Sequence, residues 1–154
     1  EHPFYLASYM TGGDVYGGRG DPEWVNVVPS AQYLDRYVFF TDPTYSETSL
    51  VVVRRKQDGG FADVTLDCAG TLAGWAPIDA DHEYTRVDLV TGDFQGVNGC
   101  ANGRHVIGST NPIGVTVWGW GSPASLGLKT TNVSYAYPAG AALRAINDVK
   151  VIPQ

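Results

Sequence analysis

Two tryptophans separated by one residue are the first feature of this sequence that could recognise a ligand. Trp118 and Trp120 lie in the apolar stretch Gly114–Trp120, which is typical of a β-strand. Side chains two positions apart point to the same side of a strand, about 7 Å from one another. An exposed pair of indole rings at that spacing would stack on the apolar C–H faces of a sugar.

A strand buried on both faces is the alternative explanation for the same pair. Gly119 and Gly121 favour burial, because glycine permits the close approach of a second backbone. In that case other tryptophans would contact the ligand. Trp75 and Trp24 lie in turn-like contexts, and we include both among the candidate ligand-binding residues.

Three carboxylates at alternate positions, Asp79, Asp81 and Glu83, would lie on one side of an extended segment. Calcium takes about six to eight oxygen ligands, often from closely spaced carboxylates, so these residues are a candidate calcium site. They lack the glycine and the distal glutamate of an EF-hand loop, and a solvated acidic loop is the simpler interpretation. We therefore expect no cofactor, with calcium as the alternative.

The two cysteines, Cys68 and Cys100, are not arranged as a C-x-x-C pair, and two thiolates alone do not make a structural zinc site. A disulfide between them would close a loop of about 30 residues and contribute roughly 3–4 kcal/mol to stability. Such a bond requires an oxidising compartment. Two free thiols in a cytosolic protein, a reactive thiol or a metal ligand are the remaining alternatives.

Signatures of catalysis are missing from the sequence. His2, His82 and His105 do not have the spacing of a metal site, and there is no Gly-x-Ser-x-Gly element. A glycosidase needs two carboxylates at a defined separation, which a sequence alone cannot place. We interpret His105 as a packed, hydrogen-bonded structural residue, and we predict that the protein is not an enzyme.

Composition limits the classes of protein to which this chain can belong. It has 154 residues, 44% of them apolar and 17% charged, with a net charge of −6. This size fits one domain, and the apolar fraction excludes disorder. The negative charge makes nucleic acid and anionic membranes poor partners. No window approaches the roughly 18 apolar residues of a membrane-spanning helix.

Short β-strands are the elements that must position these residues. Alternating apolar and polar residues, with turn signals at intervals of about 8–12 residues, favour an antiparallel β-sandwich or jelly roll, and a closed barrel is the competing architecture. We expect one or two helical turns at Ser30–Asp35, after Pro29. The candidate strands are Trp24–Val28, Tyr37–Phe40, Ser49–Arg55, Ala62–Cys68, Tyr84–Val90, His105–Gly108, Gly114–Trp120, Val133–Tyr137 and Val149–Ile152.

Several segments of the chain form a recognisable set: Gly20-Asp21-Pro22-Glu23 with Pro29, Gln32-Tyr33 and Tyr37-Val38-Phe39, then Asn102–Ser109, Asn111–Val115, Val117–Gly121, Ser134–Gly140 and Ile146–Val149. Together they resemble the IgGFc-binding-protein N-terminal domain family, over roughly residue 20 to the C-terminus. Departures from the family pattern are Ile113, where an aromatic residue is usual, and Ala136, where glycine is usual. The spacing of the two cysteines is similar to that of the bacterial branch, in which the module occurs in large secreted or surface proteins.

The resemblance implies a non-catalytic extracellular binding or adhesion module, without implying that the ligand is an immunoglobulin and without catalytic residues to transfer. It also explains Asp21 of the tripeptide Arg19-Gly20-Asp21, which integrins bind in exposed loops, as part of a family element.

Together these observations predict an all-β, antiparallel, sandwich or jelly-roll-like fold with one disulfide. We expect residues 1–154 to form a single binding or adhesion domain, excised from a larger bacterial surface protein and located outside the cell or on its surface. Its partner would be a glycan or a surface protein, with no nucleic acid and no membrane insertion. A structural or assembly domain of a large surface protein is the alternative function, and a jelly-roll glycosidase is the less favoured one.

Overall fold

The computed structural model describes residues 4–13 and 17–143 of the chain. Among these residues every strand pairing is antiparallel, and the helical elements are short 3-10 segments. The strands are β1 (Ala7–Met10), β2 (Glu23–Asn26), β3 (Leu34–Thr41), β4 (Glu47–Arg55), β5 (Val64–Leu66), β6 (Gly70–Thr71), β7 (Ala76–Pro77), β8 (His82–Thr91), β9 (Gln95–Gly96), β10 (Gly103–Trp120) and β11 (Ser134–Pro138).

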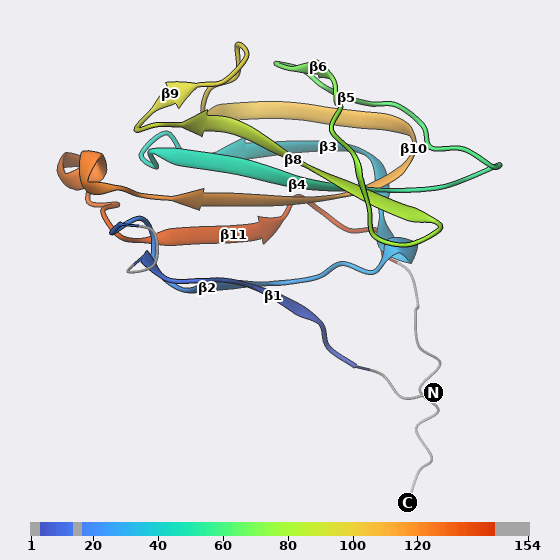
Figure 1. The fold of residues 1–154 in the computed structure, drawn as a ribbon, viewed down its shortest axis with the longest axis horizontal. Coiled ribbons are helices and arrows are strands. Elements are labelled where there is room, and N and C mark those ends of the chain that lie inside the picture. Colours follow the sequence, from blue (N-terminus) through green and yellow to red (C-terminus); the bar gives the residue numbers. More distant parts are fainter. Residues whose placement is uncertain (1–3, 14–16, 144–154) are drawn as a thin grey trace, which may run out of the picture.

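The long strand β10 organises the fold, because its two halves have different neighbours. The first half pairs with β3 on one side and β5 on the other, and the second half pairs with β4 and β11. The register with β3 shifts between Gly108 and Ile113, and the strand bends there (Figure 1). One curled sheet therefore supplies two layers.

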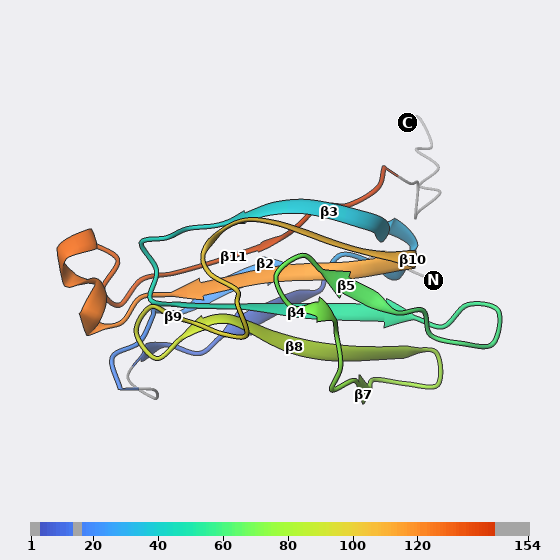
Figure 2. The same cartoon turned by 90° about the horizontal axis from the view of Figure 1, so that it is seen from above.

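The first layer contains β3, the first half of β10, β5 and β6, whereas the second layer contains β11, the second half of β10, β4, β8 and β7. The short strand β9 pairs with the end of β8. Seen from above, the long strands β3, β4, β8 and β10 run along a common direction (Figure 2). The prediction of an all-β, antiparallel, sandwich-like fold is thus confirmed.

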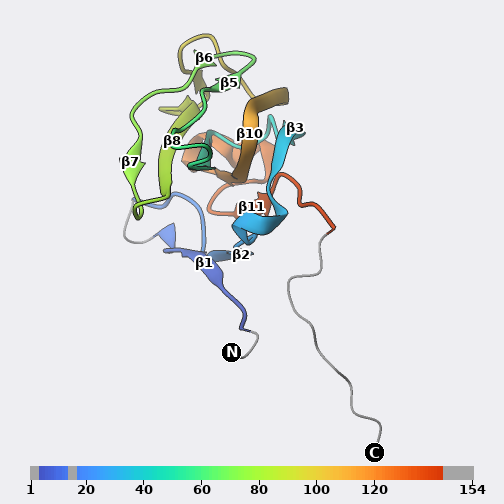
Figure 3. The ribbon, with the colours of Figure 1, turned by 90° about the vertical axis from the view of Figure 1, so that its right-hand side faces the viewer.

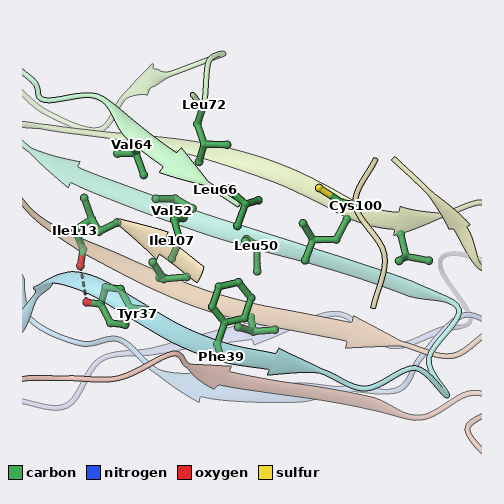
Figure 4. Packing of buried hydrophobic residues seen from close by; sticks show 14 residues of the cluster. Tyr37, Phe39, Leu50, Val52, Val64, Leu66, Leu72, Cys100, Ile107 and Ile113 are labelled. Atoms are coloured by element: carbon green, nitrogen blue, oxygen red, sulfur yellow. Dashed lines mark hydrogen bonds between the residues drawn. The ribbon is translucent and has the colours of Figure 1, made fainter. Parts of the chain in front are cut away.

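The hydrophobic core lies between these layers. Leu50 and Val52 of β4 are fully buried, as is Ile107 of the first half of β10 (Figure 4). Burial of residues two positions apart, such as Leu50 and Val52, is expected of a strand with one face on the core. The buried phenol of Tyr37 is satisfied, since it accepts the Leu34 backbone N–H at 2.9 Å and donates to the Ile113 carbonyl at 2.5 Å.

The strands β1 and β2 form a separate two-stranded hairpin that packs against β11 (Figures 1 and 3). Val25 is buried, so its face of the hairpin is turned towards the protein. Tyr9 and Trp24 are directly opposite one another in the pairing and remain 74% and 54% exposed. The hairpin therefore presents aromatic side chains to solvent and forms one wall of the groove described below.

The predicted disulfide is present and joins Cys68, after β5, to Cys100, before β10. It ties together two loops at one end of the first layer. The two residues are separated by 32 positions, so the bond closes a loop of the expected size. None of the described helices is long and apolar enough to cross a lipid bilayer.

The helical segment expected at residues 30–35 is a single 3-10 turn, η2 (Ser30–Gln32), and it ends early because Leu34 already pairs with Ile113 at the start of β3. Two other local expectations differ from the structure. The two strands predicted at residues 105–108 and 114–120 are one continuous strand. The strands β1, β6, β7 and β9 and the 3-10 segment η3 (Pro123–Leu128) were not predicted. The strand expected at residues 149–152 lies outside the described residues.

Candidate binding groove

A groove of about 540 Å³ lies on the outer face of the second layer. The core-facing residues of β4 and β10 are the buried Leu50, Val52, Val115 and Val117, so the alternate positions of the same strands point outwards. Opposite the β4–β10 surface, the hairpin forms the second wall. The groove is lined by Tyr9, Met10, Thr11, Arg19, Glu47, Ser49, Val51, Arg86, Trp118 and Trp120.

The two tryptophans that the sequence places on one side of a strand lie together in this groove. Trp118 is 9% exposed and contributes to the floor. Trp120 is half-buried, and the Arg86 guanidinium lies 5.6 Å from its ring centre. Arg86 also forms an ion pair with Asp88 at 3.1 Å. The aromatic surface available to a ligand therefore comes mainly from Trp120.

Charged groups stand at one end of the groove. The Glu47 side chain is almost completely buried and forms an ion pair with Arg19. The same Glu47 oxygen accepts the Asp93 backbone N–H at 3.2 Å, and Arg19 Nη1 lies 3.6 Å from Asp93 Oδ1. A buried carboxylate needs such partners, because the loss of its counter-charge would leave an uncompensated charge. The end of the groove is thus polar and preorganised.

The tripeptide Arg19-Gly20-Asp21 is built into the fold. Gly20 is buried with φ = +66°, and its N–H donates to the Gly121 carbonyl at 2.8 Å. The Asp21 backbone N–H donates to Ser134 Oγ at 3.0 Å. With the arginine paired to Glu47, the tripeptide packs along β10 and β11 and is not displayed at a loop tip.

The other two candidate tryptophans do not line the groove. Trp75 is half-buried, its ring centre lies 3.9 Å from the Arg54 guanidinium, and its Nε1 donates to the Leu72 carbonyl at 3.2 Å. Trp24 is exposed on the outer face of the hairpin. The structure therefore brings together two of the four candidate tryptophans and separates the others.

The three carboxylates considered for calcium have separate partners. Glu83 forms an ion pair with Arg54 at 2.5 Å. Asp79 accepts the Asp81 backbone N–H at 2.8 Å and lies 3.0 Å from His82 Nδ1, and these hydrogen bonds hold the pKa of the Asp79 carboxyl below its usual value. Within residues 4–13 and 17–143, the three carboxylates do not form a cluster that could hold a metal ion.

Sequence reasoning did not identify Arg19, Glu47 and Arg86 as groove residues. They come from segments far apart in the chain and meet only through the strand pairing of β4 with β8 and the packing of the 17–22 segment. No local pattern marks them. Sequence reasoning also missed the cluster of Asp67, Cys68 and His105, whose ligand atoms lie within 4.8 Å of one another.

A family model described as IgGFc binding protein matches residues 1–119. The match covers the hairpin, both layers up to Gly119 of β10 and every residue of the groove except Trp120. The final strand β11 lies beyond the matched range, although it pairs with β10. Neither the curated proteins nor the solved structures include a match to this chain.

Proposed function

The chain belongs to the IgGFc binding protein family, and from that membership we propose a non-catalytic extracellular module that binds a glycan in the groove of Trp118 and Trp120. The combination of an aromatic surface with fixed charged groups carries this proposal. Trp120 offers an apolar face for a sugar ring, while Arg19, Glu47 and Arg86 offer charged groups for its hydroxyls. The groove volume of about 540 Å³ is within the range of small-molecule sites.

The absence of a catalytic pair supports binding without turnover. Hydrolysis of a glycosidic bond generally uses two carboxylates on opposite sides of the bond, about 5–10 Å apart. Among the described residues that line the groove, Glu47 is the single carboxylate, and it is paired with Arg19. One carboxylate cannot supply both of the groups that this reaction uses.

The disulfide supports an extracellular location, since such bonds persist in oxidising compartments. As part of the same proposal, residues 1–154 act as one module of a larger bacterial surface protein. A role in adhesion follows from a module of this kind, because it would tether its parent protein to the glycans of another surface.

A protein ligand is the second candidate, favoured by the exposed aromatic face of the hairpin. Aromatic side chains are enriched at the centres of protein interfaces and carry much of their binding energy. Four such residues lie on or beside the hairpin with more than half of their surface exposed: Phe4 (83%), Tyr5 (88%), Tyr9 (74%) and Trp24 (54%). Tyr9 also lines the groove, whereas a protein bound through Trp24 would not need Trp118 or Trp120.

A glycan array with matched tryptophan variants tests the proposal. The array presents neutral, sialylated and uronic-acid oligosaccharides, and the wild-type chain is compared with Trp120→Ala, Arg86→Ala and Trp24→Ala. We expect wild-type binding that falls by about tenfold for each groove variant, equivalent to about 1.4 kcal/mol, and no change for Trp24→Ala. Near-UV circular dichroism checks that each variant is folded.

The other outcomes separate the alternatives. A blank array with the wild-type chain rejects the glycan ligand. Capture of a defined surface protein that depends on Trp24, and not on Trp120, would instead support the protein ligand. Appearance of new reducing ends on any arrayed sugar would show an enzyme.

A further inference from the structure

Three potential metal ligands meet at one end of the first layer, away from the groove, and a fourth residue is bonded to one of them. The ligand atoms of Asp67, Cys68 and His105 all lie within 4.8 Å of one another. Cys100 is bonded to Cys68, so its sulfur lies beside the same cluster. Two thiolates, an imidazole and a carboxylate are all ligands that zinc accepts in a tetrahedral site.

His105 is already oriented as a metal-binding histidine would be. The residue is 5% exposed, and its Nε2 lies 2.7 Å from the Ala101 carbonyl oxygen. A carbonyl can only accept, so Nε2 carries a proton. The other nitrogen, Nδ1, faces the cluster. Histidines that bind metals commonly donate their second N–H to a backbone carbonyl in this manner, which fixes the ring and the tautomer.

The imidazole of His105 and the carboxylate of Asp67 face one another. His105 Nδ1 lies 3.1 Å from Asp67 Oδ1, so both ligand atoms already stand on the same side of the cluster. The carboxylate is held in place because its Oδ2 accepts the Val106 backbone N–H at 2.9 Å. The ring packs on Phe39, with ring centres 5.5 Å apart.

We propose that reduction of the Cys68–Cys100 disulfide creates a zinc site at this cluster, with the two sulfurs, His105 Nδ1 and one Asp67 oxygen as the four ligands. A thiol or phosphine reductant supplies two electrons, the S–S bond breaks, and two protons from water give two thiols. Zn²⁺ then binds the sulfurs, and both thiol protons, together with any proton on Nδ1, pass to solvent. The metal is neither oxidised nor reduced.

The geometry fits a tetrahedral ion. Zinc–ligand bonds of about 2.0–2.3 Å place neighbouring ligand atoms about 3.3–3.8 Å apart, close to the 3.1 Å between Nδ1 and the Asp67 oxygen. The Cα atoms of the cysteines are 4.9 Å apart, so side-chain rotation separates the sulfurs without a large backbone movement. The same two loops are therefore joined by a covalent bond under oxidising conditions and by a metal ion under reducing conditions.

Cobalt titration of the full chain tests the site. The protein is reduced with a phosphine, kept free of oxygen and titrated with Co²⁺, whose tetrahedral thiolate complexes absorb strongly in the near ultraviolet and in the red. We expect saturation at one equivalent, displacement by Zn²⁺, and no absorption with the oxidised protein. An absence of thiolate–cobalt absorption in the reduced chain would overturn the proposal.

Three single substitutions distinguish this site from two cysteines that chelate metal on their own. His105→Gln and Asp67→Asn should each weaken Zn²⁺ binding by at least about tenfold, since even outer-shell changes cost about 10–100-fold. His82→Gln is the matched control, because His82 lies 3.0 Å from Asp79 at the surface, in an equivalent pair without cysteines; it should change nothing. Equal affinity in all three variants would overturn the proposal.

A second measurement tests the proposal if the chain unfolds when its disulfide is reduced. Binding of a structural metal contributes directly to folding, so Zn²⁺ should restore the near-UV circular dichroism of a reduced chain that has unfolded. Failure to restore it would overturn the proposal. Asp67 is exposed, so Asp67→Asn is the variant expected to fold in the oxidised state if His105→Gln does not.

Discussion

The guanidinium of Arg54 lies 3.9 Å from the ring centre of Trp75. The same guanidinium forms an ion pair with Glu83 at 2.5 Å and donates from Nη1 to the Ala62 carbonyl at 2.7 Å. The Arg54 and Glu83 side chains are only 13% and 16% exposed, so solvent screens their attraction weakly. One face of the Trp75 ring is thus occupied by an internal cation.

Substitution Arg54→Lys should destabilise the fold by about 1–2 kcal/mol. Lysine keeps the charge but loses the planar group that stacks on the ring and reaches Glu83 and Ala62 at the same time. Urea denaturation followed by tryptophan fluorescence measures the change. Arg55→Lys is the control, because Arg55 is exposed at the end of β4, and equal midpoints for the two variants would contradict the role given to Arg54.

Replacement of both cysteines by alanine should lower the free energy of unfolding by about 3–4 kcal/mol, the loop-entropy value for the observed separation of 32 residues. The measurement is the urea midpoint at pH 7. Wild-type protein reduced in metal-free buffer serves as the comparison and should lose a similar amount. A double variant as stable as the oxidised wild type would show that the bond does not stabilise the fold.

The fold was largely predictable because most strands carry their own pattern. Residues 49–55 are rich in valine and residues 84–90 alternate, and the two segments pair with one another in the structure. The bend in β10 was not predictable, because Pro112 normally ends a strand. Here it lies between Gly108 and Ile113, where the register shifts and the strand changes layer. The strand β1 was missed because residues 7–10 have no buried face.

The groove was predictable only in part. A period of two places Trp118 and Trp120 on one side of β10, and this relationship depends on nothing beyond the strand itself. The solvent exposure of each indole ring depends on tertiary packing, which the sequence of one strand does not determine. The charged neighbours of the two rings also depend on tertiary packing, because Glu47 lies opposite Trp120 through the pairing of β4 with β10 and Arg19 reaches the groove from a loop.

Substitution Gly119→Ala should destabilise the fold by about 1–3 kcal/mol, the usual cost of overpacking. A Cβ at Gly119 would overlap the ring of Tyr135 on β11, which is directly opposite in the pairing. Thermal or urea denaturation measures the change. Gly60→Ala is the control, since a Cβ there meets no atom within 4 Å, and a loss of stability as large at Gly60 would refute the packing explanation.

The stability of the fold should fall steeply above about pH 10. Burial raises the pKa of Tyr135 to about 12, and burial together with Tyr37 raises the pKa of Tyr33 to about 12. A raised phenol pKa means that the unfolded chain loses its proton first. The stabilisation is therefore complete below pH 10 and is lost between pH 10 and 12, at about 1.4 kcal/mol per pH unit for each phenol.

The variant Tyr135→Phe isolates one of these two contributions. It removes a hydroxyl that accepts the Asp42 backbone N–H at 3.3 Å, so it should cost about 0.5–1.5 kcal/mol at pH 8, where both phenols are protonated in the folded and the unfolded state. Its stability should then decline less steeply with pH than that of the wild type, by about 1.4 kcal/mol per pH unit. Urea midpoints at intervals from pH 8 to pH 11 give both slopes. Parallel curves for the two proteins would show that Tyr135 is not a source of the alkaline transition.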